Sequence, residues 1–159
     1  LGRGAGYNVT SGSGNVILGS QNSSNAYAPV FDVTTQNDRV VVGTTSTTNA
    51  YIQVAWTVVS DLRDKVVLGD VPYGLDFVSK LKPIKYQYKE SRESDVAYGP
   101  VRYGFGAQDV LAQETESPVI VDTENSEKLK ITDSHLIPVL VKAIQELKAE
   151  FDAYKAAHP

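Results

Sequence analysis

The sequence predicts an α+β protein in two parts, a β-rich segment over residues 1–59 and a mixed domain over residues 60–159 that ends in a long helix. Charge is the first observation behind this prediction. Only four charged side chains precede residue 60, at Arg3, Asp32, Asp38 and Arg39, whereas the other 30 follow it. Helical spacing of apolar residues near the C-terminus is the second. A chain of 159 residues is long enough for one modest core or for two small units, and the boundary near residue 60 favours two.

Composition excludes several classes of function. The chain has no cysteine and only two histidines, His135 and His158, which excludes thiol nucleophiles, cysteine zinc sites and clusters of imidazoles. Three acidic residues lie close together in the sequence, Asp122, Glu124 and Glu127. They lack the spacing and the glycine of an EF-hand calcium loop, so we predict a solvated turn. No metal or cofactor is therefore expected. The net charge of −4 does not favour nucleic acid as a partner, and the absence of a run of about 18 apolar residues or a signal peptide does not favour a membrane.

The first part is polar but returns regularly to Val, Ile, Tyr and Phe. Residues 16–18 form a short apolar run between glycines, which predicts a brief strand. Residues 30–33 and 40–42 are two further short apolar runs, and the Asn37-Asp38 step between them suits a hairpin turn. Such short strands cannot bury a core alone, so we expect them to be stacked or intertwined with copies of themselves. A flexible polar linker is the alternative, and it would not need the recurring apolar residues.

This pattern has known parallels. Residues 6–19 resemble the β-roll repeats of trimeric adhesin heads and bacteriophage tail fibres, and residues 31–45 resemble the last shaft strands before a fibre's C-terminal chaperone. The resemblance implies that residues 1–59 are the end of an intertwined trimeric β shaft, β-helix-like or β-roll-like, and that Leu1 lies within a longer shaft.

The junction between the two parts holds a candidate nucleophile with a candidate base. Ser60 and Lys65 lie five residues apart in a predicted turn, and a serine–lysine pair is a known arrangement that needs no histidine. The lysine accepts the serine proton only when its amine is neutral, which desolvation or a nearby cation favours. On residues alone a second interpretation stands beside this one: Ser60 caps the turn, and Lys65 pairs with Asp61 or Asp64 on the surface.

Four motifs in order carry a second resemblance. They are Ser-Asp-x-Arg-x-Lys at residues 60–65, a helix-then-strand signature at 74–88, Gly-Phe-x-Ala-Gln-x-Val at 104–110 and Ala-Ile-Gln-Glu-Leu at 143–147. Together they resemble the S74 peptidase family, the self-cleaving intramolecular chaperones at the C-termini of phage tailspikes, tail fibres and neck appendages.

The resemblance assigns roles at the junction. It implies that Ser60 is the nucleophile and Lys65 the base, that the bond between Val59 and Ser60 is cleaved, and that Asp61 and Arg63 complete the motif. The chain would then act once, as a self-cleaving serine endopeptidase.

Partners and location follow from the same resemblance. The chaperone would bind itself as a homotrimer and the upstream shaft of its own fibre; the shaft would remain in the virion and the chaperone would be released in the cytoplasm of the infected host. A host receptor or polysaccharide would be contacted only through the upstream fibre. The alternative is an uncleaved trimeric tip that serves adhesion. A polysaccharide-degrading enzyme is disfavoured, because glycoside hydrolysis needs paired carboxylates and the first part offers only Asp32 and Asp38.

Elements around these motifs are predicted from local signals. A helix over residues 73–81 ends before Pro83, because the residue before a proline is pushed out of the α region. Alternation predicts a strand over residues 84–89, and the apolar run at 54–59 predicts a strand that packs firmly. Residues 115–125 resemble the extended protrusions with which family members embrace a shaft.

The last element is a helix of about 20 residues that begins near residue 136. Its apolar residues recur at intervals of four and three, which is the spacing of a coiled-coil seam. A single apolar stripe needs a partner, and neighbouring copies in a trimer would supply it. The seam consists of Leu140, Ile144, Leu147, Phe151 and Tyr154.

Overall fold

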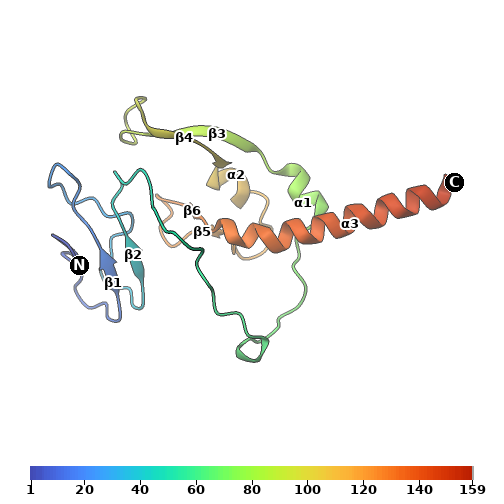
Figure 1. Ribbon diagram of the computed structural model, residues 1–159, viewed down its shortest axis with the longest axis horizontal. Coiled ribbons are helices and arrows are strands. Elements are labelled where there is room, and N and C mark those ends of the chain that lie inside the picture. The colour runs from blue at the N-terminus through green and yellow to red at the C-terminus, as the bar shows by residue number, and fades with distance from the viewer. Residues whose placement is uncertain (159) are drawn as a thin grey trace. The chain divides into compact units, whose positions relative to one another are not determined.

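The computed structural model describes residues 1–158 and divides the chain into two compact units, Leu1–Val58 and Val59–Pro159. The chain is α+β, with three two-stranded sheets and a long C-terminal helix (Figure 1). The first unit contains only short strands, and the second contains all the helices that are described.

The first unit is a coil in which the chain passes over itself in parallel. Strand β1 (Val16–Leu18) pairs in parallel with β2 (Val40–Val42), and the paired residues are 24 positions apart. Polar contacts beside the strands keep the same interval: the Ser13 N–H donates to Asn37 Oδ1 at 2.8 Å, and the Arg39 N–H donates to Asn15 Oδ1 at 2.9 Å. One turn of the coil therefore takes 24 residues.

This geometry corrects the predicted hairpin. Residues 30–33 form no strand, and β2 pairs with β1 rather than with them. Asp38 does adopt a turn conformation, with φ of 56°, but its N–H donates to the Ser13 carbonyl of the preceding coil at 2.9 Å. The turn thus closes a corner of the coil, because its backbone is satisfied by the layer beneath it and not by a neighbouring strand in a hairpin.

The predicted strand over residues 54–59 is also wrong. The structure assigns no strand there, and Trp56 is 79% exposed. A strand requires a neighbour that completes its hydrogen-bond ladder, and within residues 1–158 none pairs with this segment.

The second unit packs its helices around one small core. Helices α1 (Leu75–Lys80) and α2 (Ala107–Leu111), the short strand pair β5 (Val121–Asp122) and β6 (Lys130–Ile131), and helix α3 (Leu136–Ala157) surround it. The buried residues of this core are Phe77, Val110, Ile120, Val121, Leu136 and Val139.

Helix α1 confirms the predicted helix and is anchored on α3. Its first amide, the Leu75 N–H, donates to Glu146 Oε2 at 2.6 Å. Gly74 permits this approach, because a Cβ at that position would lie 2.1 Å from the same oxygen. The anchor caps α1 with a side chain that follows it by 71 residues.

The strand predicted over 84–89 is confirmed as β3 (Pro83–Lys89), which forms an antiparallel hairpin with β4 (Ala97–Phe105). The register shifts between Tyr86 and Tyr88, which marks a bulge. Most of the hairpin's side chains are exposed within one chain.

The segment predicted as a protrusion instead enters the core. Ile120 and Val121 are each 2% exposed. The reason is Glu114, a buried carboxylate just after α2, which accepts the N–H groups of Val119, Ile120 and Val121 at 2.8, 2.8 and 3.0 Å. These three bonds fold the segment back against the unit.

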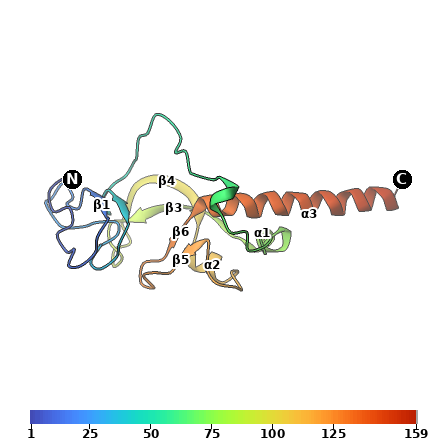
Figure 2. The same cartoon turned by 90° about the horizontal axis from the view of Figure 1, so that it is seen from below.

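Helix α3 confirms the predicted terminal helix and has 22 residues. It follows a 3-10 turn over Asp133–His135 and buries Leu136, Val139 and Ala143 against the unit. Its C-terminal half extends beyond the other elements of the unit in both views (Figures 1 and 2). No helix among residues 1–158 is long and apolar enough to cross a membrane.

Candidate functional site: a serine–lysine turn

The side chains of Ser60 and Lys65 meet across a single 3-10 turn. The turn spans Leu62–Asp64, and the Lys65 N–H closes it by donating to the Leu62 carbonyl at 3.2 Å. The lysine side chain then reaches back, and its Nζ donates to Ser60 Oγ at 2.6 Å. The predicted nucleophile and the predicted base are therefore in direct hydrogen-bond contact, as general-base chemistry requires.

Asp61 and Arg63 hold this turn in shape. The Asp61 carboxylate caps it by accepting the Arg63 N–H at 2.9 Å, and the Arg63 guanidinium adds a bidentate pair, with Nη2 at 2.6 Å from Oδ2 and Nε at 3.1 Å from Oδ1. The side-chain hydrogen bonds of Arg63, and then its backbone N–H, hold the pKa of Asp61 below its usual range. Asp61 consequently binds Arg63 rather than Lys65, which leaves Lys65 to Ser60. This geometry sets aside the interpretation in which Lys65 pairs with Asp61.

The turn is exposed to water within one chain. Ser60 and Lys65 are both exposed, as are the residues on either side of them. An amine removes the serine proton only in its neutral form, and water favours the ammonium form. The contact supplies the geometry of a nucleophile and a base.

The two histidines each bind a backbone carbonyl. His135 Nδ1 lies 2.8 Å from the Val119 carbonyl and His158 Nδ1 lies 3.0 Å from the Tyr154 carbonyl. The first contact joins α3's start to residue 119, and the second lies within the last turn of α3.

The acidic trio forms a turn in the second unit. Asp122 accepts the Glu124 N–H at 2.9 Å and the Lys130 ammonium at 3.3 Å. Among residues 1–158 no three His, Cys, Asp or Glu side chains gather as a metal-binding group.

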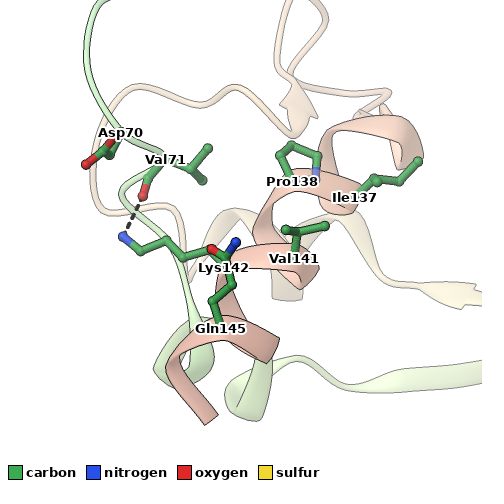
Figure 3. Close-up of a pocket in the computed structure, with 7 residues that line it drawn as sticks. All are labelled: Asp70, Val71, Ile137, Pro138, Val141, Lys142 and Gln145. Carbon is green, nitrogen blue, oxygen red and sulfur yellow. Dashed lines mark hydrogen bonds between the residues drawn. The ribbon is translucent and has the colours of Figure 1, made fainter. Parts of the chain in front are cut away.

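A hollow beside the start of α3 carries no comparable chemistry (Figure 3). Its lysine is engaged, since Lys142 Nζ donates to the Val71 carbonyl at 2.7 Å. The lining includes no serine, threonine, cysteine or histidine, so it offers no nucleophile with a base. The lining residues are Asp70, Val71, Ile137, Pro138, Val141, Lys142 and Gln145.

The predicted seam on α3 is exposed along its whole length. Its members range from Leu140, 44% exposed, to Ile144, 65% exposed. The face that packs on the unit is a different one, made by Leu136, Val139 and Ala143. The helix thus presents a second apolar face beyond the one that its own unit covers.

Sequence reasoning missed two residues that shape this unit. Glu114 has no local signal, because its partners are amides that any residue would supply. Glu146 lies inside the Ala-Ile-Gln-Glu-Leu motif, which marks its position but does not indicate its role as a cap for α1.

Comparison with known proteins finds a match for part of the second unit. Residues 60–116 match the family model Peptidase_S74, described as chaperone of endosialidase. The match begins at Ser60 and contains the first three of the four motifs, while α3 lies outside it. No curated protein and no solved structure matches the chain.

Proposed function

We propose that this chain is a C-terminal intramolecular chaperone that trimerises, directs the folding of a phage fibre shaft and then releases itself by cleaving the Val59–Ser60 bond. The match of residues 60–116 to the S74 chaperone family model supports the chaperone role. The observation that carries the proposal is the 2.6 Å contact between Lys65 Nζ and Ser60 Oγ, in the first residues of the matched domain. The shaft, residues 1–59 and what precedes them, stays in the virion, and the chaperone is left in the infected cell.

The proposed chemistry uses only residues of the turn. Lys65, in its neutral form, takes the proton from Ser60 Oγ, and the oxygen attacks the carbonyl carbon of Val59. The carbon–oxygen bond forms, the carbon–nitrogen bond to Ser60 breaks, and the nitrogen receives the proton from Lys65. Water then adds to the resulting ester. Val59 leaves as a carboxylate, and Ser60 keeps its hydroxyl and gains a free amine, so each chain reacts once.

Exposure of the turn supports cleavage after assembly. A single chain leaves both Ser60 and Lys65 exposed to water, and a lysine can act as a base only when its amine is neutral. Packing of neighbouring chains over the turn would remove that water and favour the neutral amine. The chaperone would therefore stay attached while the shaft is folding and leave when folding is complete. After its departure, unfolding of the shaft must proceed without the element that nucleated it.

The exposed seam of α3 supports a trimer. Its residues lie on a face that the chain's own core does not use, at coiled-coil spacing. Three helices that bury this face together would hold three shaft chains in register, which shortens the search for the non-local strand pairs of a shaft.

A permanent fibre tip that serves adhesion is the second candidate. The exposed tyrosines of the first unit, such as Tyr7 and Tyr51, favour it to the extent that aromatic rings stack on sugars.

The mass of the purified product separates the two candidates. Expression of residues 1–159 should yield a fragment that begins at Ser60, whereas Ser60→Ala and Lys65→Arg chains should remain whole, because the first lacks the nucleophile and the second keeps the charge without a usable base. Lys80→Arg, a surface change elsewhere in the domain, is the matched control and should be cleaved normally. Cleavage of a trimeric Ser60→Ala chain at the same bond would overturn the proposed mechanism.

A further inference from the structure

The coil of the first unit has a third copy in the sequence. The pattern that ends each observed coil is a strand followed by glycine, Val16-Ile17-Leu18-Gly19 in the first and Val40-Val41-Val42-Gly43 in the second. Residues 64–69, Asp-Lys-Val-Val-Leu-Gly, repeat residues 38–43, Asp-Arg-Val-Val-Val-Gly. The third copy therefore includes the base of the proposed dyad, Lys65.

The start of the third copy keeps the interval of the coil. Asn49-Ala50-Tyr51 repeats Asn25-Ala26-Tyr27 at the 24-residue spacing that the structure shows between stacked residues. The end of the copy comes two residues later than this spacing requires, so two residues are inserted between Tyr51 and Asp64. Internal repeats of this kind are units that stack on one another.

The glycine that closes each copy has a positive φ. Gly19, Gly43 and Gly69 have φ of 80°, 89° and 139°, in the region that favours glycine. Gly19 and Gly43 stack directly, because a Cβ on Gly19 would lie 4.0 Å from the Gly43 Cα. A Cβ on Gly69 would have nothing within 4 Å, so no neighbour stacks on this glycine.

The strand positions of the third copy are apolar and uncovered. Val66, Val67 and Leu68 are 85%, 69% and 95% exposed, whereas Val41, the counterpart of Val67, is 4% exposed inside the coil. Among residues 1–158, β2 has one strand partner, β1, so its other edge is open. An open edge and an uncovered apolar strand with the same repeat are complementary.

We propose that residues 66–68 pair in parallel with β2 of the same chain, in the register Val40↔Val66, Val41↔Val67 and Val42↔Leu68, and so close a third coil. The turn that holds Ser60 and Lys65 then becomes part of the last coil of the shaft. The consequence of this pairing for cleavage rests on the proposed function. Cleavage waits for the third coil to close, because closure fixes the backbone on the C-terminal side of the Ser60–Lys65 turn. The cut would fall inside the final coil.

Disulfide trapping tests the strand pairing without any need for cleavage. In a Ser60→Ala background, Val42→Cys with Leu68→Cys places two thiols on neighbouring parallel strands, whose spacing of about 4.8 Å suits a disulfide. The chain has no cysteine of its own, so any disulfide comes from the pair introduced. Leu18→Cys with Val42→Cys, already neighbours in the structure, is the positive control, and Val40→Cys with Leu68→Cys is out of register by two residues.

The expected result is an intrachain disulfide in the 42/68 chain, formed at least about tenfold faster than in the 40/68 chain, since the second pair exceeds the reach of a disulfide. Failure of the 42/68 pair to form while the 18/42 pair forms would overturn the proposal. A disulfide between two chains would overturn the proposal that residues 66–68 pair with β2 of their own chain. It would show instead that the open edge of β2 pairs with a second copy of the chain. Since the trapped chain cannot cleave, failure of the pairing and failure of the proposed cleavage are observed separately.

A second variant links the coil to the reaction. Val67→Asp puts a carboxylate at the inward position of the third coil and should slow cleavage by about tenfold or more, since a buried unpaired charge is strongly unfavourable. Val66→Asp, on the outward side of the same strand, is the matched control. Equal cleavage of the Val67→Asp chain and the wild type, with the dyad intact, would contradict the coupling.

Discussion

Lys65 Nζ donates to Ser60 Oγ at 2.6 Å. Asp61 lies closer than Ser60 to Lys65 in the sequence, but its carboxylate binds Arg63 and not Lys65. Because Asp61 binds Arg63, the Lys65 side chain is left to contact Ser60. A turn in which Asp61 bound Lys65 would hold the lysine away from the serine and leave Arg63 without its bidentate acceptor.

The first prediction concerns this pairing of Asp61 with Arg63. Asp61→Asn removes the charge that binds Arg63 and weakens the cap, and we expect cleavage at Val59–Ser60 to slow by about tenfold, because positioning of a base is worth that order of rate. Asp64→Asn is the control on the other acidic residue of the turn. The measurement is the rate at which the fragment beginning at Ser60 appears in intact-mass spectra.

Acid should disturb the same turn only well below the usual range of an aspartate. Arg63 lowers the pKa of Asp61 in the folded state, so the contribution of this pair is present above the unfolded pKa and is lost as pH falls through the folded pKa. The Asp61 carboxyl carbon signal in NMR should therefore titrate below that of an aspartate in a short peptide. Titration in the ordinary range would contradict the pairing.

The buried carboxylate of Glu114 predicts a large loss of stability. Glu114→Gln replaces an acceptor by an N–H group that faces the amides it should bind, and it should lower the free energy of unfolding of the second unit by about 1–3 kcal/mol, the usual effect of leaving a buried donor unsatisfied. Glu116→Gln, an exposed position nearby, should change little. Urea unfolding of Ser60→Ala chains with and without each substitution measures the difference.

The cap on α1 predicts a smaller effect. Glu146→Ala leaves the Leu75 N–H without its acceptor and should cost about 1 kcal/mol, as removal of an N-cap does. Glu150→Ala, one turn further along α3 and exposed, is the matched control. If the two variants unfold at the same urea concentration, α1 is not held by Glu146 in solution.

Assembly is tested on the exposed face of α3. If the chain forms the proposed trimer, Ile144→Asp should convert it to a monomer, because it puts a carboxylate in the middle of the seam. The fold of each chain should survive, since Leu136, Val139 and Ala143 pack on the unit from another face. Sedimentation measures the mass and circular dichroism the helix content. A trimer that persists with Ile144→Asp, while Gln145→Asp behaves in the same way, would show that the seam is not the interface.

Alkaline pH tests the first unit. Partial burial and then the hydrogen bond to Asp32 raise the pKa of Tyr27 to about 12 from its usual value near 10. The neutral phenol is therefore favoured by folding: the contribution is complete below pH 10 and is lost as pH rises toward 12. The difference between the absorbance titrations of wild type and Tyr27→Phe should be that of one tyrosine that ionises near pH 12.

Local patterns predicted three elements of the second unit, α1, β3 and α3. A proline that ends α1, alternation along β3 and the spacing of apolar residues in α3 are each set by residues that are neighbours in sequence, and the observed elements agree. The Ser60–Lys65 pairing belongs to the same class, because five residues and one turn suffice to join the two side chains.

Two predictions failed for different reasons: the partner of β2 lies 24 residues away, and the side chain that folds residues 119–121 back is a nearby carboxylate with no signal in the sequence. Asn37 and Asp38 do form a turn, yet the strand after it pairs with β1, one coil earlier, and no hairpin forms. Residues 119–121 look like an extended arm in sequence, but three hydrogen bonds to Glu114 draw them into the core.

The sequence by itself predicted a division near residue 60, the types of α1, β3 and α3 in the second unit, and the two side chains of the candidate dyad. Tertiary structure decided which strands pair, which segments are buried and which residue each carboxylate of the turn and the core binds. The physical reason is range: turn and helix geometry depends on neighbours within a few residues, whereas parallel pairing at 24 residues and a cap from 71 residues away exist only when the chain is folded.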